Sequence, residues 1–128
     1  MAPPIRSCEE VGEFFGEGWR SGPVRRAVSF LARWHGLRPE PAGYGLWLDR
    51  NSVHGLGMKV PLWVCGLDSD LLVILTKELA PRHVVRIRDA ESILELPLTL
   101  TPPPIGVALS WISARDLDSL RDADRQPE

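Results

Sequence analysis

The sequence has few of the features that mark specialised classes of protein. It has only two cysteines, Cys8 and Cys65, which are too few for a disulfide framework. No run approaches the ~20 apolar residues that a membrane-spanning helix needs, and the start lacks the apolar segment of a secretory signal. The formal net charge is only −2, which argues against a nucleic-acid binder that relies on net charge. We therefore expect a soluble, cytoplasmic protein with no membrane span and no nucleic-acid partner.

Signature motifs for catalysis and for cofactor binding are also lacking. The chain has no G-x-S-x-G, P-loop, G-x-G-x-x-G, C-x-x-C or H-E-x-x-H pattern. His54, Met58 and Cys65 lie close together in sequence, but alternation along one strand places Cys65 on the opposite face from the other two. Two soft ligands are fewer than the three or four of a well-held metal. We expect no metal, no cofactor and no catalytic residue, and a reduced Cys65 in the core.

The composition is that of a globular protein, because 44% of the residues are hydrophobic and 25% are charged. A chain of 128 residues can bury one ordinary core. Ser7 and Glu10 fit a capping box, which predicts a short helix over residues 8–15. Pro23 begins an apolar stripe at helical spacing, which predicts an amphipathic helix over residues 23–34.

Beyond residue 43 the sequence breaks into short apolar runs that are separated by turn formers such as DRNS, DSD and TPPP. This rhythm is typical of a meandering antiparallel sheet that curls towards a barrel. We predict a mainly β (α+β) fold, a small antiparallel β-barrel-like sheet with one N-terminal amphipathic helix. The expected parts are an N-terminal extension with a short helix (1–23), a single β-rich domain (24–112) and a charged C-terminal tail (113–128) capped by Ser113. The predicted strands cover residues 44–48, 52–58, 61–67, 71–76, 83–88, 92–98 and 106–112.

Glu95 interrupts the apolar strand ILELPL. Leu94 and Leu96 alternate towards one face of that strand, so Glu95 points to the other face together with Ile93. Two interpretations stay open. The face is solvated, or the carboxylate lies inside the sheet and pairs with His54 or an arginine in a small pocket.

A basic stripe follows from the segment APRHVVRIRD. Arg82, Arg86 and Arg88 share one parity, and the residues between them take the opposite face of the strand. In one interpretation the arginines form a solvated strand face and discourage edge-to-edge pairing. In the other they bind an acidic partner or a phosphate group.

The residues from 45 to 97 resemble an uncharacterised bacterial and archaeal family, domain of unknown function 192. The likeness lies in the order and spacing of a GL strand, a histidine four residues before a methionine (His54 and Met58), a proline followed by an LD strand, a hydrophobic-D-x-D hairpin, and a closing LELP that contains Glu95. With the lead-in and the last strand it spans roughly residues 24–112. The resemblance implies a small β-rich barrel and no established activity.

The chain departs from the family pattern at two informative positions. Trp63 stands where relatives commonly carry an acid, and Leu71 stands where the D-x-D turn usually carries glycine. Such departures indicate a diverged member of that family.

We expect a non-enzymatic protein that binds an unidentified small ligand or protein partner around His54, Met58 and Glu95. These residues match the family pattern although they are imperfect choices for a plain core. One alternative is an enzyme that uses Glu95 and His54 as acid and base, which requires both groups near one substrate atom. Another is an accessory protein of a larger assembly that docks through exposed tryptophans.

Overall fold

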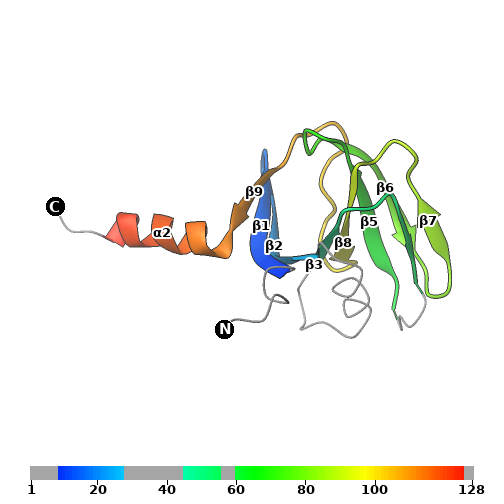
Figure 1. Ribbon diagram of the computed structural model, residues 1–128, viewed down its shortest axis with the longest axis horizontal. Helices are drawn as coiled ribbons and strands as arrows, with labels where there is room; N and C mark the ends of the chain where they lie inside the picture. Colours follow the sequence, from blue (N-terminus) through cyan, green and yellow to red (C-terminus); the bar gives the residue numbers. More distant parts are fainter. Residues whose placement is uncertain (1–8, 28–44, 56–59, 126–128) are drawn as a thin grey trace, which may run out of the picture.

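The computed structural model describes residues 9–27, 45–55 and 60–125 (Figure 1). In these stretches the chain forms two β-sheets and one helix at the C-terminal end. The elements in chain order are β1 (Glu9–Gly16), β2 (Trp19–Ala27), β3 (Gly45–Leu48), β4 (Ser52–His54), β5 (Leu62–Leu67), β6 (Val73–Leu79), β7 (Val84–Arg86), β8 (Ser92–Pro97), β9 (Ser110–Ser113) and α2 (Ala114–Arg125).

The larger sheet has seven strands in the order β6-β5-β8-β3-β2-β1-β9, and β4 pairs with β7 in a separate two-stranded sheet. Strands form at or near every position predicted beyond residue 43. The prediction of a mainly β fold is thus confirmed. Turn chemistry separates the strands as expected, although Leu71 in the DSDL turn has the left-handed φ of 63° that usually selects glycine.

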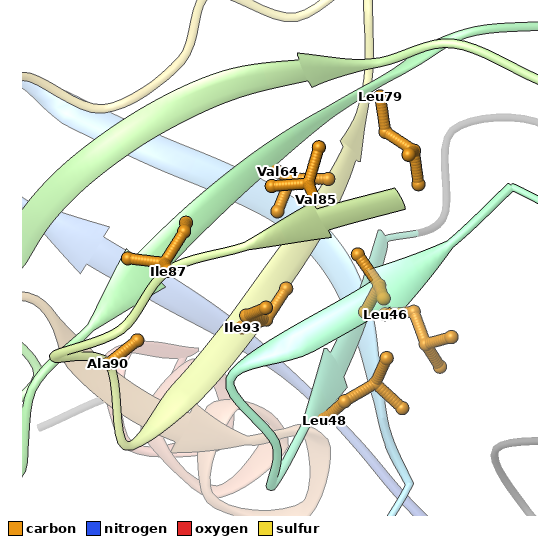
Figure 2. Packing of buried hydrophobic residues seen from close by; sticks show 9 residues of the cluster. Leu46, Leu48, Val64, Leu79, Val85, Ile87, Ala90 and Ile93 are labelled. Atoms are coloured by element: carbon orange, nitrogen blue, oxygen red, sulfur yellow. The ribbon is translucent and has the colours of Figure 1, made fainter. Parts of the chain in front are cut away.

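Both faces of the large sheet carry a buried apolar cluster, and strand β8 contributes side chains to each of them. Ile93 belongs to a core cluster that includes Val64 and Leu46, whereas its neighbour Leu94 belongs to a second cluster that includes Phe14. Successive side chains of a strand point to opposite faces, so one apolar run supplies both clusters. We call these the first and the second cluster. Figure 2 shows the first cluster, in which side chains from the large sheet meet Val85 of the smaller one and Ile87, which follows β7.

The predicted N-terminal helices are wrong where the structure describes them. Residues 9–16 form β1, and residues 23–27 belong to β2; residues 28–34 lie outside the described part of the chain. Long-range contacts override the local signals. Gly12 takes a position where a Cβ would lie 2.6 Å from the Ile112 carbonyl oxygen, so the close approach of β9 requires a glycine there. The sheet thus includes residues that we assigned to an N-terminal extension.

The large sheet is neither a closed barrel nor purely antiparallel. Strand β2 pairs with β3 in parallel across Val24↔Gly45 to Ala27↔Leu48, and the other pairings are antiparallel. Residues 28–44 connect these two strands, a length that satisfies the dozen or more residues that a parallel crossover needs. The edge strands of the large sheet, β6 and β9, do not pair with each other. Leu72, just before β6, and Ala108, shortly before β9, form an isolated bridge.

Helix α2 follows β9 directly and leads away from the sheets (Figure 1). Ser113 caps it as predicted, because its hydroxyl accepts a hydrogen bond of 3.2 Å from the backbone N–H of Asp116. The helix contacts β1 and β9. No helix in the described residues is long and apolar enough to cross a membrane.

A buried carboxylate fixes the β1–β2 hairpin. Glu13 is only 6% exposed, and it accepts hydrogen bonds from Arg20 Nε at 2.6 Å, Arg20 Nη2 at 2.9 Å and the backbone N–H of Gly22 at 3.0 Å. The hydrogen bond from Arg20 lowers the pKa of Glu13 against the opposing effect of burial. The hydrogen-bonding capacity of this carboxylate is therefore used within the fold.

The variant Glu13→Gln should lower the free energy of unfolding by about 2 kcal/mol near pH 7, because it weakens hydrogen bonds to a charged group. The pKa of Glu13 lies below its ordinary value of 4.5 in the folded chain. The stabilisation is hence complete above that value and is lost as the pH falls through the lower, folded pKa. Urea unfolding, followed by tryptophan fluorescence at a series of pH values, measures this free energy. The difference between wild type and variant should become smaller as the pH falls into the acid range. Glu17→Gln, on the exposed turn of the same hairpin, is the control. A difference in the free energy of unfolding that stays the same into strong acid would refute this account.

Candidate functional site

The two-stranded sheet has a buried inner face and an open outer face. Val53 pairs with Val85, and both side chains are buried in the first cluster. The neighbouring pair, His54 and Val84, therefore points outwards, and so does Arg86 opposite Ser52. Val84 is 69% exposed, and Arg86 is also exposed.

Two more arginines extend this outer face beyond the strand ends. The backbone N–H of Ile87 donates to the carbonyl oxygen of Asn51 at 2.8 Å, which continues the pairing and brings the segments of Arg50 and Arg88 together. Both arginines are exposed, whereas Ile87 between Arg86 and Arg88 is buried. The predicted alternation around Ile87 is thus confirmed. The exposure and neighbourhood of Arg50 were not predicted.

Arg82 lies at the other end of β7, in a turn rather than on a strand. The N–H of His83 donates to the carbonyl oxygen of Ala80 at 3.1 Å, and Pro81 and Arg82 occupy the two central positions. Arg82 has a φ of 69°, as the third residue of a type II turn requires, although glycine or asparagine is usual there. His83 is exposed together with Arg82, so the strict alternation predicted for this end of the segment is wrong.

Gly55 fixes this turn to the end of β4. Its N–H donates to the carbonyl oxygen of His83 at 2.8 Å, and its own carbonyl oxygen accepts from the N–H of Arg82 at 3.1 Å. A Cβ on Gly55 would lie 2.6 Å from the Ala80 carbonyl oxygen, so only glycine fits between the two segments. The result places Arg82 at the same end of the small sheet as His54.

We call the surface made by these outward residues the basic face. It comprises Arg50, His54, Arg82, Val84, Arg86 and Arg88. None of its four arginines forms an ion pair with a described residue. The ion pairs that the described residues do form lie elsewhere, at Glu13–Arg20, Arg26–Asp49 and Asp118–Arg121.

Glu95 lies on a different sheet from the basic face. It pairs in register with Leu46 and Val64, both of the first cluster, so its side chain shares their face of β8 with Ile93. The predicted orientation is confirmed. The carboxylate is not on a solvated face, because Glu95 is only 8% exposed.

The two residues that the acid–base hypothesis joins lie on different sheets. His54 is on β4 with its neighbour Val53 turned towards the core, whereas Glu95 is on β8 beneath the small sheet. His54 and Glu95 each have an interaction partner. Met58, the third predicted binding residue, lies outside the described residues.

Cys65 is a core residue, as predicted. It is fully buried in the second cluster, and burial raises the pKa of its thiol to about 11. The thiol is therefore protonated near neutral pH and is a poor nucleophile and metal ligand. Residues 52–67 do not form one strand, because β4 and β5 belong to different sheets. Among the described residues no group of three or more His, Cys, Asp or Glu side chains could hold a metal ion.

The described tryptophans serve the fold. Trp47 packs against Phe14 and Trp111 with ring centroids 4.7 and 4.9 Å away, and its indole N–H donates to Ser92 Oγ at 2.9 Å. The guanidinium of Arg26 covers the Trp47 ring at 4.1 Å. Trp19, Trp63 and Trp111 are half-buried, so none of the four described tryptophans offers the exposed anchor that docking to an assembly calls for; Trp34 lies outside the described residues.

Arg82→Gly should raise the free energy of unfolding by up to about 1 kcal/mol, because glycine adopts a positive φ without the steric cost that a side chain incurs. Arg88→Gly is the matched control. Arg88 is exposed and has no positive φ, so glycine there should lower stability by about 0.5–1 kcal/mol through the entropy of the unfolded chain. Thermal and urea unfolding measure both. If Arg82→Gly destabilises as much as the control, the left-handed conformation carries no strain.

Two solved structures resemble the fold. One is a protein assigned as a candidate transcription regulator from Sinorhizobium meliloti 1021, which is 20% identical with a TM-score of 0.58 over 80% of this chain and 93% of its own. The other is a protein of unknown function from Novosphingobium aromaticivorans DSM 12444, which is 16% identical with a TM-score of 0.57 over 79% of this chain and 84% of its own. No protein-family model matches the sequence, and no curated protein is similar to it. The chain is thus a small β domain that resembles uncharacterised bacterial proteins in fold.

Proposed function

We propose that this domain is a non-enzymatic binding module whose site is the basic face and whose partner is an acidic segment of another protein. One observation carries the proposal: four exposed arginines without an ion pair among the described residues lie around one pair of short strands. The inner side of the same strands is buried, so the arginines are presented on a fixed support.

The chemistry of arginine supports an acidic partner. A guanidinium offers donors in a planar fork that matches a carboxylate, and it sheds its hydration more readily than an ammonium group. A single exposed ion pair contributes only about 0–1 kcal/mol, so specific binding needs several such contacts together. Arg86 and Arg88 supply two within one short segment, and Arg50 and Arg82 supply one at each end.

Binding is favoured over acid–base catalysis by the placement of the titratable groups. A general acid and base must reach one substrate atom, but the strand pairing directs His54 to the outer side of the small sheet, whereas Glu95 faces the first cluster. The exposed residues beside His54 are Val84 and arginines, which stay protonated at neutral pH.

A protein segment is favoured over a nucleic acid by the borders of the basic face. Asp89 and Glu91 are exposed directly after Arg88, and Asp49 is exposed directly before Arg50. These acids would repel the continuous charge of a polynucleotide, and the whole chain carries a formal net charge of −2. The name of the Sinorhizobium structure makes nucleic acid the alternative to test.

Two expectations from the sequence belong to the same proposal. The first is kinship with domain of unknown function 192, which the mainly β fold supports, although the large sheet is not the closed barrel that the resemblance implies and no family model matches the chain. A cytoplasmic location suits a domain that meets its partner among other proteins of the cell.

The double variant Arg86→Glu/Arg88→Glu should weaken binding of a fluorescent oligoglutamate peptide by about tenfold or more, because two exposed contacts of up to about 1 kcal/mol each are lost and two repulsive charges are introduced. Fluorescence anisotropy measures the affinity, and raised salt should weaken the wild type. The control Arg115→Glu/Arg121→Glu makes the same charge change on exposed positions of α2 and should bind like the wild type.

A labelled single-stranded oligonucleotide is titrated in parallel. If the wild-type protein does not bind the peptide, or if the double variant and the control lose the same amount of affinity for it, the basic face is excluded as the site of an acidic segment. If the protein binds the oligonucleotide but not the peptide, the basic face is a nucleic-acid site and the proposed partner is wrong.

A further inference from the structure

We infer that the acidic segment binds in an extended conformation and carries an apolar side chain two residues from its nearest acid, with further acids beyond. This inference rests on the proposed function and adds the conformation and the residue order of the partner. It is carried by the outward side chains of β7 and by the exposed arginines of the turns at its two ends.

The spacing of the outward residues selects an extended partner. Val84 and Arg86 are two residues apart on one strand, so their side chains stand about 6.6–6.8 Å apart on the same face. An extended peptide repeats its side chains at the same distance. An α-helix places residues two apart on nearly opposite sides, so it cannot present both to this face.

Val84 gives the basic face an apolar centre. It is 69% exposed although its strand neighbour Val85 is buried, and Arg82 and Arg86 stand two residues away on either side of it in sequence. A purely electrostatic site has no use for an apolar side chain at this position. A partner that covers Val84 with its own apolar residue removes that surface from water, which is favourable in proportion to the area covered.

The arginines at the ends of β7 set the order of the remaining residues. Arg88 follows the strand and Arg82 precedes it, so the complementary order is acid, any residue, acid, any residue, apolar, any residue, acid. Arg82 occupies a backbone conformation that usually selects glycine. Leu71 also has such a φ, but only Arg82 belongs to the basic face, and strained positions of this kind are found more often at functional sites.

The test compares peptides of one composition. TETETVTETS carries the inferred order, and TTTEEVETTS contains the same three acids and the same valine with the acids clustered around the valine. The wild-type protein should bind the first about threefold or more tightly than the second, because only the first aligns its valine with Val84 while its acids meet the arginines. A third peptide, TETETTTETS, lacks the valine and measures the apolar contribution.

Val84→Thr is the matched protein variant, since threonine keeps the branched shape and the strand preference. It should remove most of the preference for TETETVTETS over TETETTTETS. Circular dichroism and thermal unfolding confirm that the variant is folded.

The outcomes separate the two proposals. If the clustered peptide binds as tightly as the ordered one, or if Val84→Thr keeps the preference for the valine peptide, the inferred conformation and order are wrong while acidic binding stands. If no acidic peptide binds the wild type, the proposed function fails, and the inference fails with it.

Discussion

The structure depends on the burial of the inner side of the β4–β7 sheet against the larger one. Val53 and Val85 belong to the first cluster together with Val64 and Ile93, and a two-stranded sheet is not stable without such packing. Once the inner side is fixed, alternation leaves the arginines and Val84 on the outer side. The apolar contact and the basic face are therefore two consequences of one strand pairing.

The distribution of charge follows the same division. Glu13 and Glu95 are buried carboxylates, and both have partners within the protein. Burial of an unpaired carboxylate would be costly, so these positions serve stability before any other role. The charges without an ion pair among the described residues include the arginines of the basic face, where solvation costs little and a partner can reach them.

The sequence predicts those features that depend on short-range periodicity. The strands after residue 43, the opposite directions of Leu94 and Glu95, the burial of Cys65 and the exposure of Arg86 all follow from alternation. It does not predict β1, because the capping box at Ser7 is a local signal and the contact of Gly12 with Ile112 joins segments far apart in the chain. The parallel pairing of β2 and β3 is likewise set by long-range packing.

The candidate site divides in the same way. Arg82, Arg86 and Arg88 are adjacent in sequence, so their common stripe is visible there. The addition of Arg50 requires the pairing of β4 with β7, and the turn conformation of Arg82 requires the close approach of Gly55. The separation of His54 from Glu95 could not be predicted either, because it depends on which sheet each strand joins.

The central claim is that partner binding occurs on the outer side of the small sheet. Titration of an isotopically labelled sample with an acidic peptide, followed by backbone amide chemical shifts, tests it most directly. The account predicts that the perturbed amides cluster in residues 50–55 and 82–88, and that Glu95 and its neighbours on β8 change little. Perturbations centred on β8 or on α2, or none at saturating peptide, would contradict it.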